Sequence, residues 1–262
     1  MRTGSERMGT PCGRDAVPYI CSRRGQLNRA LKLLRVLRHS AYWPGLLRGV
    51  AASVEHEQLL ARLPCKTVVD IGANRGQFAL VARFCCPMAK VISFEPLPEA
   101  AGGFSKVFPR DRQVVLHQVA VGPRRAEALL YVTADDDSSS LLPTGHLQQK
   151  VFPRTALKRT IVVNVAPLSD YVDSEEVAPP ALLKLDVQGF ELEALRGCQT
   201  LLDRFQYVIA ECSFSELYKG QALAHEVIRF LERYDLHLVG VYNLSSNLGR
   251  ALQGDFAFAR QP

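Results

Sequence analysis

The sequence predicts an α/β fold built on a doubly wound, mostly parallel sheet, with a β-containing insertion and an N-terminal helical extension. Three observations support this. Short apolar, β-branched segments alternate with helical patterns, a Gly-rich turn joins the first such strand to the next helix, and the alternation breaks between residues 122 and 180. The length of 262 residues suits one large domain with an appendage, and 47% hydrophobic and 22% charged residues are typical of globular proteins.

The N-terminal extension is expected to span residues 1–50, followed by one domain over residues 51–262. Residues 1–25 lack periodicity and are rich in Gly, Ser, Arg and Pro, so a disordered lead is expected. From Gln26 to about Trp43, leucines recur at helical spacing and predict an amphipathic basic helix that ends before Pro44 and Gly45. The leucines in question are Leu27, Leu31, Leu34 and Leu37. We expect them to pack on the domain; weak contact with an anionic membrane surface is the alternative. A second helix is predicted from Ala51 to Leu63.

The charge is uneven along the chain. Residues 1–50 hold ten Lys/Arg and only two acidic residues, whereas the remainder has 22 basic and 24 acidic groups. The net charge of +6 therefore belongs to the extension, and we expect no nucleic-acid binding by the domain. No stretch approaches about 18 consecutive apolar residues, and the N-terminus lacks the apolar run of a secretory signal. A cytoplasmic protein without a transmembrane segment is expected.

Metal chemistry is not indicated. The seven cysteines include no C-x-x-C pair, and the six histidines lack H-E-x-x-H spacing. We expect reduced, mainly buried thiols and no structural metal.

The domain is expected to contain helices and strands that mostly alternate along the chain. Helical patterns are expected at 77–85, 98–108, 191–202 and 224–233. Strands are expected at 67–71, 90–94, 114–119, 126–133, 160–165, 181–185, 206–211, 236–242 and 255–260. The strand–helix alternation predicts parallel pairing with right-handed crossovers.

The strongest chemical signal is the strand and turn DIGANRGQF at residues 70–78. In a doubly wound sheet this turn lies at the carboxyl edge, where Gly72 and Gly76 allow the backbone to approach a ligand closely. Asn74 tolerates positive φ, so the turn survives without a third glycine. The dinucleotide pattern G-x-G-x-x-G fails here, which disfavours NAD.

A carboxylate ends the next strand. Glu95 follows Gly76 by 19 residues, a position from which its two oxygens can accept hydrogen bonds from both hydroxyls of a ribose. The two motifs together indicate an adenosyl cofactor.

At this point the chain resembles the FkbM-type S-adenosylmethionine-dependent methyltransferases, from about Ala51 to the C-terminus. The matching motifs are DIGANRGQF (70–78), FEPLP (94–98), DDSSSLLP (136–143), LLKLDVQGFELEALRGC (182–198) and ECSFSELYKGQ (211–221). The resemblance implies a class I methyltransferase sheet whose last strand is antiparallel. It also implies S-adenosyl-L-methionine as cofactor and methyl transfer to a hydroxyl, frequently on a sugar or glycan precursor. Many members of this family have Glu where this chain has Gln188.

The candidate site residues combine both arguments. Asp186 ends its strand beside the cofactor turn and is the first candidate for the base that removes the hydroxyl proton, with Glu211 and His225 as weaker candidates. Ser138, Ser139 and Ser140 are candidates for binding the acceptor. The cofactor candidates are Asp70, Gly72, Asn74, Gly76, Phe78, Glu95, Pro96, Ala120 and Asp186.

The sequence leaves two other functions open. One is a nicotinamide-dependent oxidoreductase on the same kind of sheet, and the other is a non-catalytic binding module attached through the basic helix. Neither the acceptor hydroxyl nor the oligomeric state follows from the sequence.

Overall fold

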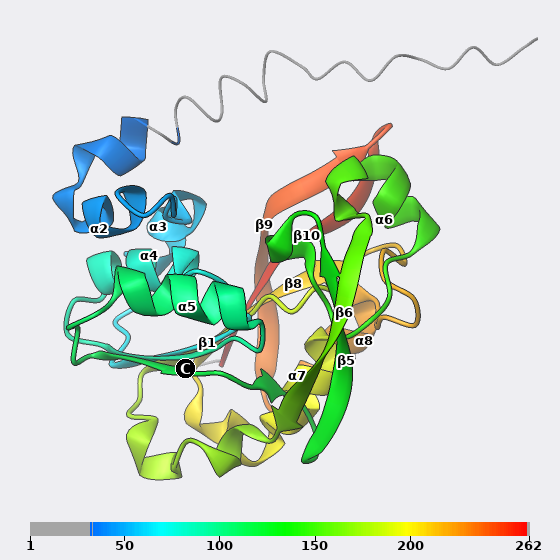
Figure 1. Cartoon of the computed structure of the whole chain (residues 1–262). Coiled ribbons are helices and arrows are strands. Elements are labelled where there is room, and N and C mark those ends of the chain that lie inside the picture. Colours follow the sequence, from blue (N-terminus) through cyan, green and yellow to red (C-terminus); the bar gives the residue numbers. More distant parts are fainter. Residues whose placement is uncertain (1–31, 33, 261–262) are drawn as a thin grey trace, which may run out of the picture.

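The computed structural model describes Lys32 and residues 34–260 (Figure 1). Its main sheet has seven strands in the order β3-β2-β1-β7-β8-β10-β9. The strands are β1 (Thr67–Ile71), β2 (Lys90–Phe94), β3 (Val114–His117), β7 (Ala181–Leu185), β8 (Tyr207–Ser213), β9 (Leu236–Asn247) and β10 (Arg250–Arg260). The first five pair in parallel, whereas β10 is antiparallel to both β8 and β9. This arrangement confirms the class I methyltransferase sheet with its antiparallel strand.

Helices cover both faces of the sheet. The α-helices are α2 (Trp43–Leu46), α3 (Glu57–Leu60), α4 (Gln77–Cys85), α5 (Pro98–Val107), α6 (His146–Val151), α7 (Glu191–Gly197) and α8 (Ala224–Glu232). Short 3₁₀ helices lie at Ser40–Tyr42, Val54–His56, Asp136–Ser138, Pro153–Thr155, Leu168–Asp170, Ser174–Glu176 and Gln199–Arg204. In Figure 1, α4 and α5 lie on one face together with α2 and α3.

The central strands are buried on both faces, which explains their continuous apolar sequences. Successive residues serve opposite cores, because side chains alternate along a strand. Val68 and Leu182 pack with α4 and α5, whereas Val69 and Leu183 pack with α7 and α8. The two cores hold the carboxyl ends of β1, β2 and β7 at one edge of the sheet.

The insertion between residues 122 and 180 forms most of a second, three-stranded sheet. Its strands are β4 (Ala120–Val121), β5 (Ala126–Thr133) and β6 (Leu157–Ala166), in the order β4-β6-β5. Leu130, Val132 and Val163 pack against Leu97 and Ala100 at the start of α5. The predicted β-containing insertion is thereby confirmed, and it stands beside the carboxyl edge of the main sheet.

The N-terminal expectations need three corrections. Pro44 and Gly45 lie inside α2, because proline is accepted in the first turn of a helix. Residues 51–63 form only the 3₁₀ turn Val54–His56 and the single-turn helix α3. Of the helix expected from Gln26, residues 26–31 and 33 lie outside the described residues, while Lys32 and residues 34–38 are helical. This helix packs through buried Val36, whereas Leu34 and Leu37 are exposed.

Over the described residues, none of the helices combines the length and apolarity needed to cross a membrane.

Candidate functional site

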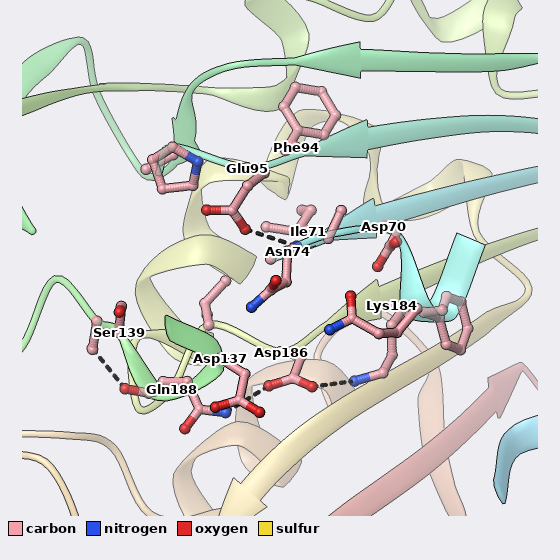
Figure 2. A pocket seen from close by; sticks show the side chains of 18 of the residues that line it. Asp70, Ile71, Asn74, Phe94, Glu95, Asp137, Ser139, Lys184, Asp186 and Gln188 are labelled. Atoms are coloured by element: carbon pink, nitrogen blue, oxygen red, sulfur yellow. Dashed lines mark hydrogen bonds and ion pairs between the residues drawn. The ribbon is translucent and has the colours of Figure 1, made fainter. Parts of the chain in front are cut away.

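A cavity of about 260 Å³ opens at the carboxyl ends of β1, β2 and β7 (Figure 2). These strands are adjacent in the sheet, and the chain order reverses between β1 and β7. Such a reversal is where open α/β sheets bind ligands, since the loops on either side diverge there. Gly72, Glu95 and Asp186 each directly follow one of the three strands and line the cavity.

The Gly-rich turn has glycine for two different reasons. Gly72 has φ +84°, and a Cβ there would lie 1.9 Å from the backbone oxygen of Asp186, so only glycine permits the close approach of the two strand ends. Gly76 has φ +92°, and its Cβ would meet the Phe108 ring at 2.7 Å. Gly76 does not line the cavity. The absence of a Cβ at Gly76 thus makes room for the rings of Phe108 and Phe104, which pack against it.

Glu95 is buried and fixed by the backbone. Its Oε2 accepts a hydrogen bond from the Asn74 N–H and its Oε1 one from the Leu97 N–H, both at 2.8 Å. Burial raises the pKa of Glu95 to about 7, although both N–H groups act in the opposite direction. Each carboxylate oxygen retains a lone pair, so two further hydrogen bonds from a ligand can be accepted.

Asp70 lies on β1 at the floor of the cavity and is almost fully buried. Its Oδ2 has no hydrogen-bond partner among the residues that the structure describes, and the same holds for Oδ1 of Asn74. Burial raises the pKa of Asp70 to about 7, partly offset by Lys184. An unpaired buried carboxylate oxygen is costly, so this atom is suited to a cationic or hydrogen-bonding ligand group.

Lys184 lies between the carboxylates of Asp186 and Asp255. Its buried Nζ lies 3.5 Å from Oδ2 of Asp186 and 3.6 Å from Oδ1 of Asp255. Burial lowers its pKa, but the surrounding carboxylates outweigh that effect and raise it above the usual range. Lys184 therefore stays charged and fixes the position of Asp186.

Asp255 is in turn held by His56 and Asn243. Its Oδ2 lies 3.0 Å from Nε2 of His56 and accepts a hydrogen bond from Nδ2 of Asn243 at 2.7 Å. Nδ1 of His56 faces the Ser53 carbonyl oxygen at 3.3 Å. Both ring nitrogens thus face acceptor oxygens, which fixes the ring and lets His56 orient Asp255.

Asp186 and Glu211 share one amide. Nε2 of Gln188 donates to Oδ1 of Asp186 at 2.8 Å and to Oε2 of Glu211 at 2.9 Å, while its Oε1 accepts from the Tyr218 hydroxyl at 2.7 Å. Asp186 lines the cavity and Glu211 does not. Burial raises the pKa of Glu211 well above its usual range. Of these two candidates for a base, Asp186 is the one in contact with the cavity.

The loop at residues 135–140 closes the cavity from the insertion side. Arg75 of the Gly-rich turn forms an ion pair with Asp136. Ser139 and Ser140 line the cavity, but the Ser140 hydroxyl already donates to the backbone oxygen of Gln188 at 2.7 Å. Ser138 is not a lining residue; its carbonyl oxygen accepts from Tyr218.

The other residues predicted from the sequence lie partly at the cavity and partly away from it. Phe78, Pro96 and Ala120 line the cavity, and Ala120 belongs to an apolar wall with Val119, Leu130 and Leu141. His225 is exposed on α8 and does not line the cavity, so the structure does not bring it together with Asp186. The described residues contain no cluster of three or more His, Cys, Asp or Glu side chains able to hold a metal ion.

Four residues from the N-terminal part of the chain line the cavity and were not predicted from the sequence. Lys32, Ser53, Glu55 and His56 also line the cavity, and Lys32 forms an ion pair with Glu55 at 2.9 Å. His56 and Asp255 are 199 positions apart, and no local pattern signals that they meet.

Known proteins share sequence with this chain across the region of the site. NoeI, a 2-O-methyltransferase of Sinorhizobium fredii, is 26% identical over 203 residues, which span 73% of this chain and 82% of NoeI. AglP, a hexuronic acid methyltransferase of Haloferax volcanii, is 24% identical over 142 residues, about half of either chain. Among solved structures, a TehB-like SAM-dependent methyltransferase from Corynebacterium glutamicum matches with a TM-score of 0.45 and 12% identity, covering 89% of this chain and all of that one.

The sequence model of the methyltransferase FkbM domain matches residues 70–238. That range contains both strand ends that carry Glu95 and Asp186, the whole insertion, and Glu211 on β8. This chain therefore belongs to the FkbM methyltransferase family.

Proposed function

We propose that this protein transfers a methyl group from S-adenosyl-L-methionine to a hydroxyl of a sugar or glycan precursor. The observation that carries the proposal is the buried Oδ2 of Asp70, which has no hydrogen-bond partner among the described residues, together with the fixed carboxylate of Glu95 at the same cavity. The first suits an ammonium group and the second a pair of ribose hydroxyls. S-adenosyl-L-methionine carries both groups: the ammonium belongs to its amino acid end, and the ribose hydroxyls belong to its adenosine end.

The remaining walls fit the same ligand. Val119, Ala120, Leu130 and Leu141 form an apolar side suited to an adenine ring, next to Glu95 and Pro96. Oδ1 of Asn74 is a further unpaired acceptor in the turn, as far as the described residues go. When bound, the cofactor supplies an electrophilic methyl group.

Asp186 is the residue we assign to the acceptor. Lys184 and Gln188 hold its carboxylate from two sides, and it still lines the cavity. A fixed carboxylate orients the acceptor hydroxyl and takes its proton as the new bond forms, which compensates for the weak nucleophilicity of an alcohol. Gln188 has no basic group and contributes position alone. Ser139 lies at the same cavity and is available to a further acceptor hydroxyl.

A sugar acceptor is supported by the relatives. NoeI is a 2-O-methyltransferase and AglP is a hexuronic acid methyltransferase, and both share sequence with this chain. The nicotinamide alternative has no comparable support, because the turn lacks G-x-G-x-x-G.

Binding is tested first. Calorimetry should show a one-site titration with S-adenosylmethionine and with S-adenosylhomocysteine, and none with NAD. Binding of NAD alone would refute the assignment.

Turnover is tested with methyl-labelled cofactor and a set of free and lipid-linked sugars, counting label in the sugar. Asp186→Asn keeps the shape of the side chain but loses its basicity, so the rate should fall roughly 10²-fold with cofactor affinity little changed. Asp203→Asn is the matched control, since Asp203 is exposed and is not a lining residue. An equal fall in affinity and rate would make Asp186 a cofactor residue instead.

A further inference from the structure

An apolar surface on the N-terminal segment has no role in the proposed reaction. It consists of Leu34, Leu37, Trp43 and Leu47, which are 58%, 47%, 51% and 82% exposed, and we refer to it as the N-terminal apolar face. Exposed large apolar side chains are usually scattered singly on a protein surface, whereas these four lie within 14 residues of sequence.

This face is held in place by the opposite side of the same segment. Val36, Tyr42 and Gly45 are buried in the core that α4 helps to form, and the Tyr42 hydroxyl donates to Glu57 at 2.7 Å. Leu34 and Leu37 are one helical turn apart and therefore share a side, away from Val36. The exposure of the leucines is thus a consequence of how the segment packs.

Three exposed arginines lie in the same stretch of sequence as the N-terminal apolar face. Arg35, Arg38 and Arg48 are exposed, and Arg35 and Arg38 form no ion pair with any residue in the described part of the chain. From residue 16 to residue 54 the sequence holds seven Lys/Arg and no acidic residue. The partner of this surface therefore has to be both apolar and negatively charged.

We propose that the N-terminal apolar face docks on an anionic phospholipid surface. Apolar side chains with flanking arginines, and a tryptophan at the boundary, are the composition that partitions into the headgroup region of a bilayer. A second copy of the chain fits less well, because a two-fold contact would bring the same arginines together. The proposal does not depend on the reaction assigned above.

Trp43 provides the direct test, because it is the only tryptophan in the chain. Its fluorescence is measured on the full chain with vesicles of phosphatidylcholine containing about 30% phosphatidylserine, without cofactor or acceptor. We expect a blue shift and quenching by brominated lipid, both absent with pure phosphatidylcholine. Raising the salt from about 0.1 M to about 0.5 M should weaken binding severalfold.

The variant Leu34→Ser/Leu37→Ser/Leu47→Ser should require at least about tenfold more lipid for half-maximal cosedimentation. The matched control is Leu129→Ser/Val162→Ser, a cross-strand pair of exposed apolar residues on β5 and β6 that should change this value less than about twofold. These residues are exposed, so neither variant removes core packing.

Several outcomes would overturn the proposal. Unchanged Trp43 emission with anionic vesicles, or equal loss in both variants, excludes lipid docking at this face. A blue shift that depends on protein concentration without lipid identifies a second copy as the partner. Emission that is already blue-shifted in the dilute free protein means that another part of the chain covers the face. Equal binding to neutral and anionic vesicles would contradict the role of the arginines.

Discussion

Replacing Asp70 by asparagine should stabilise the ligand-free protein above neutral pH and weaken its binding of S-adenosylmethionine. The cause is the cost of holding a nearly fully buried carboxylate at the cavity, one of whose oxygens has no hydrogen-bond partner in the described part of the chain. Burial raises the pKa of Asp70 from an ordinary 3.8 to about 7. A difference of that size corresponds to a penalty on the order of 4 kcal/mol when the group is ionised.

The sign of the pH dependence follows from that shift. The folded state binds the Asp70 proton more tightly than the unfolded state, so this group lowers stability progressively from about pH 4 to about pH 7 and by a constant amount above. An asparagine amide has no such titration, but its imperfect hydrogen bonding costs roughly 1–3 kcal/mol. The variant should therefore gain about 1–3 kcal/mol at pH 8 and little or nothing below pH 5.

Urea unfolding of the ligand-free protein at pH 5 and pH 8 measures this difference, and calorimetry at pH 8 measures cofactor affinity. Loss of a charge-assisted hydrogen bond is worth about 1.5–3 kcal/mol, so the dissociation constant should rise at least tenfold. A variant that is equally destabilised at both pH values would refute the burial argument. Unchanged affinity in the folded variant would refute the assignment of Asp70 to the cofactor.

Three further predictions concern the same cavity. Glu95→Gln should weaken S-adenosylmethionine and S-adenosylhomocysteine alike by at least about tenfold, because both carry the ribose; exposed Glu99→Gln is the control, and an effect on only one ligand would argue against a ribose contact. Gly72→Ala should lower the free energy of unfolding by roughly 1–3 kcal/mol or more, since its Cβ would lie 1.9 Å from the Asp186 oxygen, whereas Gly102→Ala on α5 meets nothing within 4 Å and should be neutral or stabilising. Wild-type affinity for S-adenosylmethionine should fall as the pH drops below about 7, by up to about tenfold per pH unit for each group, because Asp70 and Glu95, whose pKa values are both raised to about 7, bind the cofactor as carboxylates; a pH-independent dissociation constant from pH 5 to 8 would contradict this.

The strands of the main sheet could be predicted from the sequence because they are short, apolar and bounded by clear turns. Predicted strands at 67–71, 90–94 and 181–185 coincide with β1, β2 and β7. The carboxyl ends of parallel strands meet at one edge, so the sequence alone predicts that Glu95 and Asp186 belong to a common site.

The parts that escaped prediction depend on long-range packing. A repeat of leucines indicates an amphipathic helix, but not which of its sides the rest of the protein covers; here Val36 faces the core and Leu34 does not. The same limit applies to Gly72 and to Gly76, whose neighbour is the Phe108 ring. Both glycines have positive φ, but the atom that each one must avoid does not follow from the sequence.

The amide of Gln188 explains how the carboxylates of Asp186, which lines the cavity, and Glu211, which does not, remain close together. Its Nε2 donates to Asp186 (Figure 2). The same Nε2 donates to Glu211, and Tyr218 fixes the amide by donating to its Oε1. A glutamate at this position would place a third carboxylate between the other two, and it could remain there only by taking up a proton. With glutamine, no proton is needed for these hydrogen bonds, and Lys184 is left to neutralise Asp186. Gln188 thus holds the Asp186 carboxylate at the cavity by a donated hydrogen bond, in the position from which we propose that it acts on the acceptor hydroxyl.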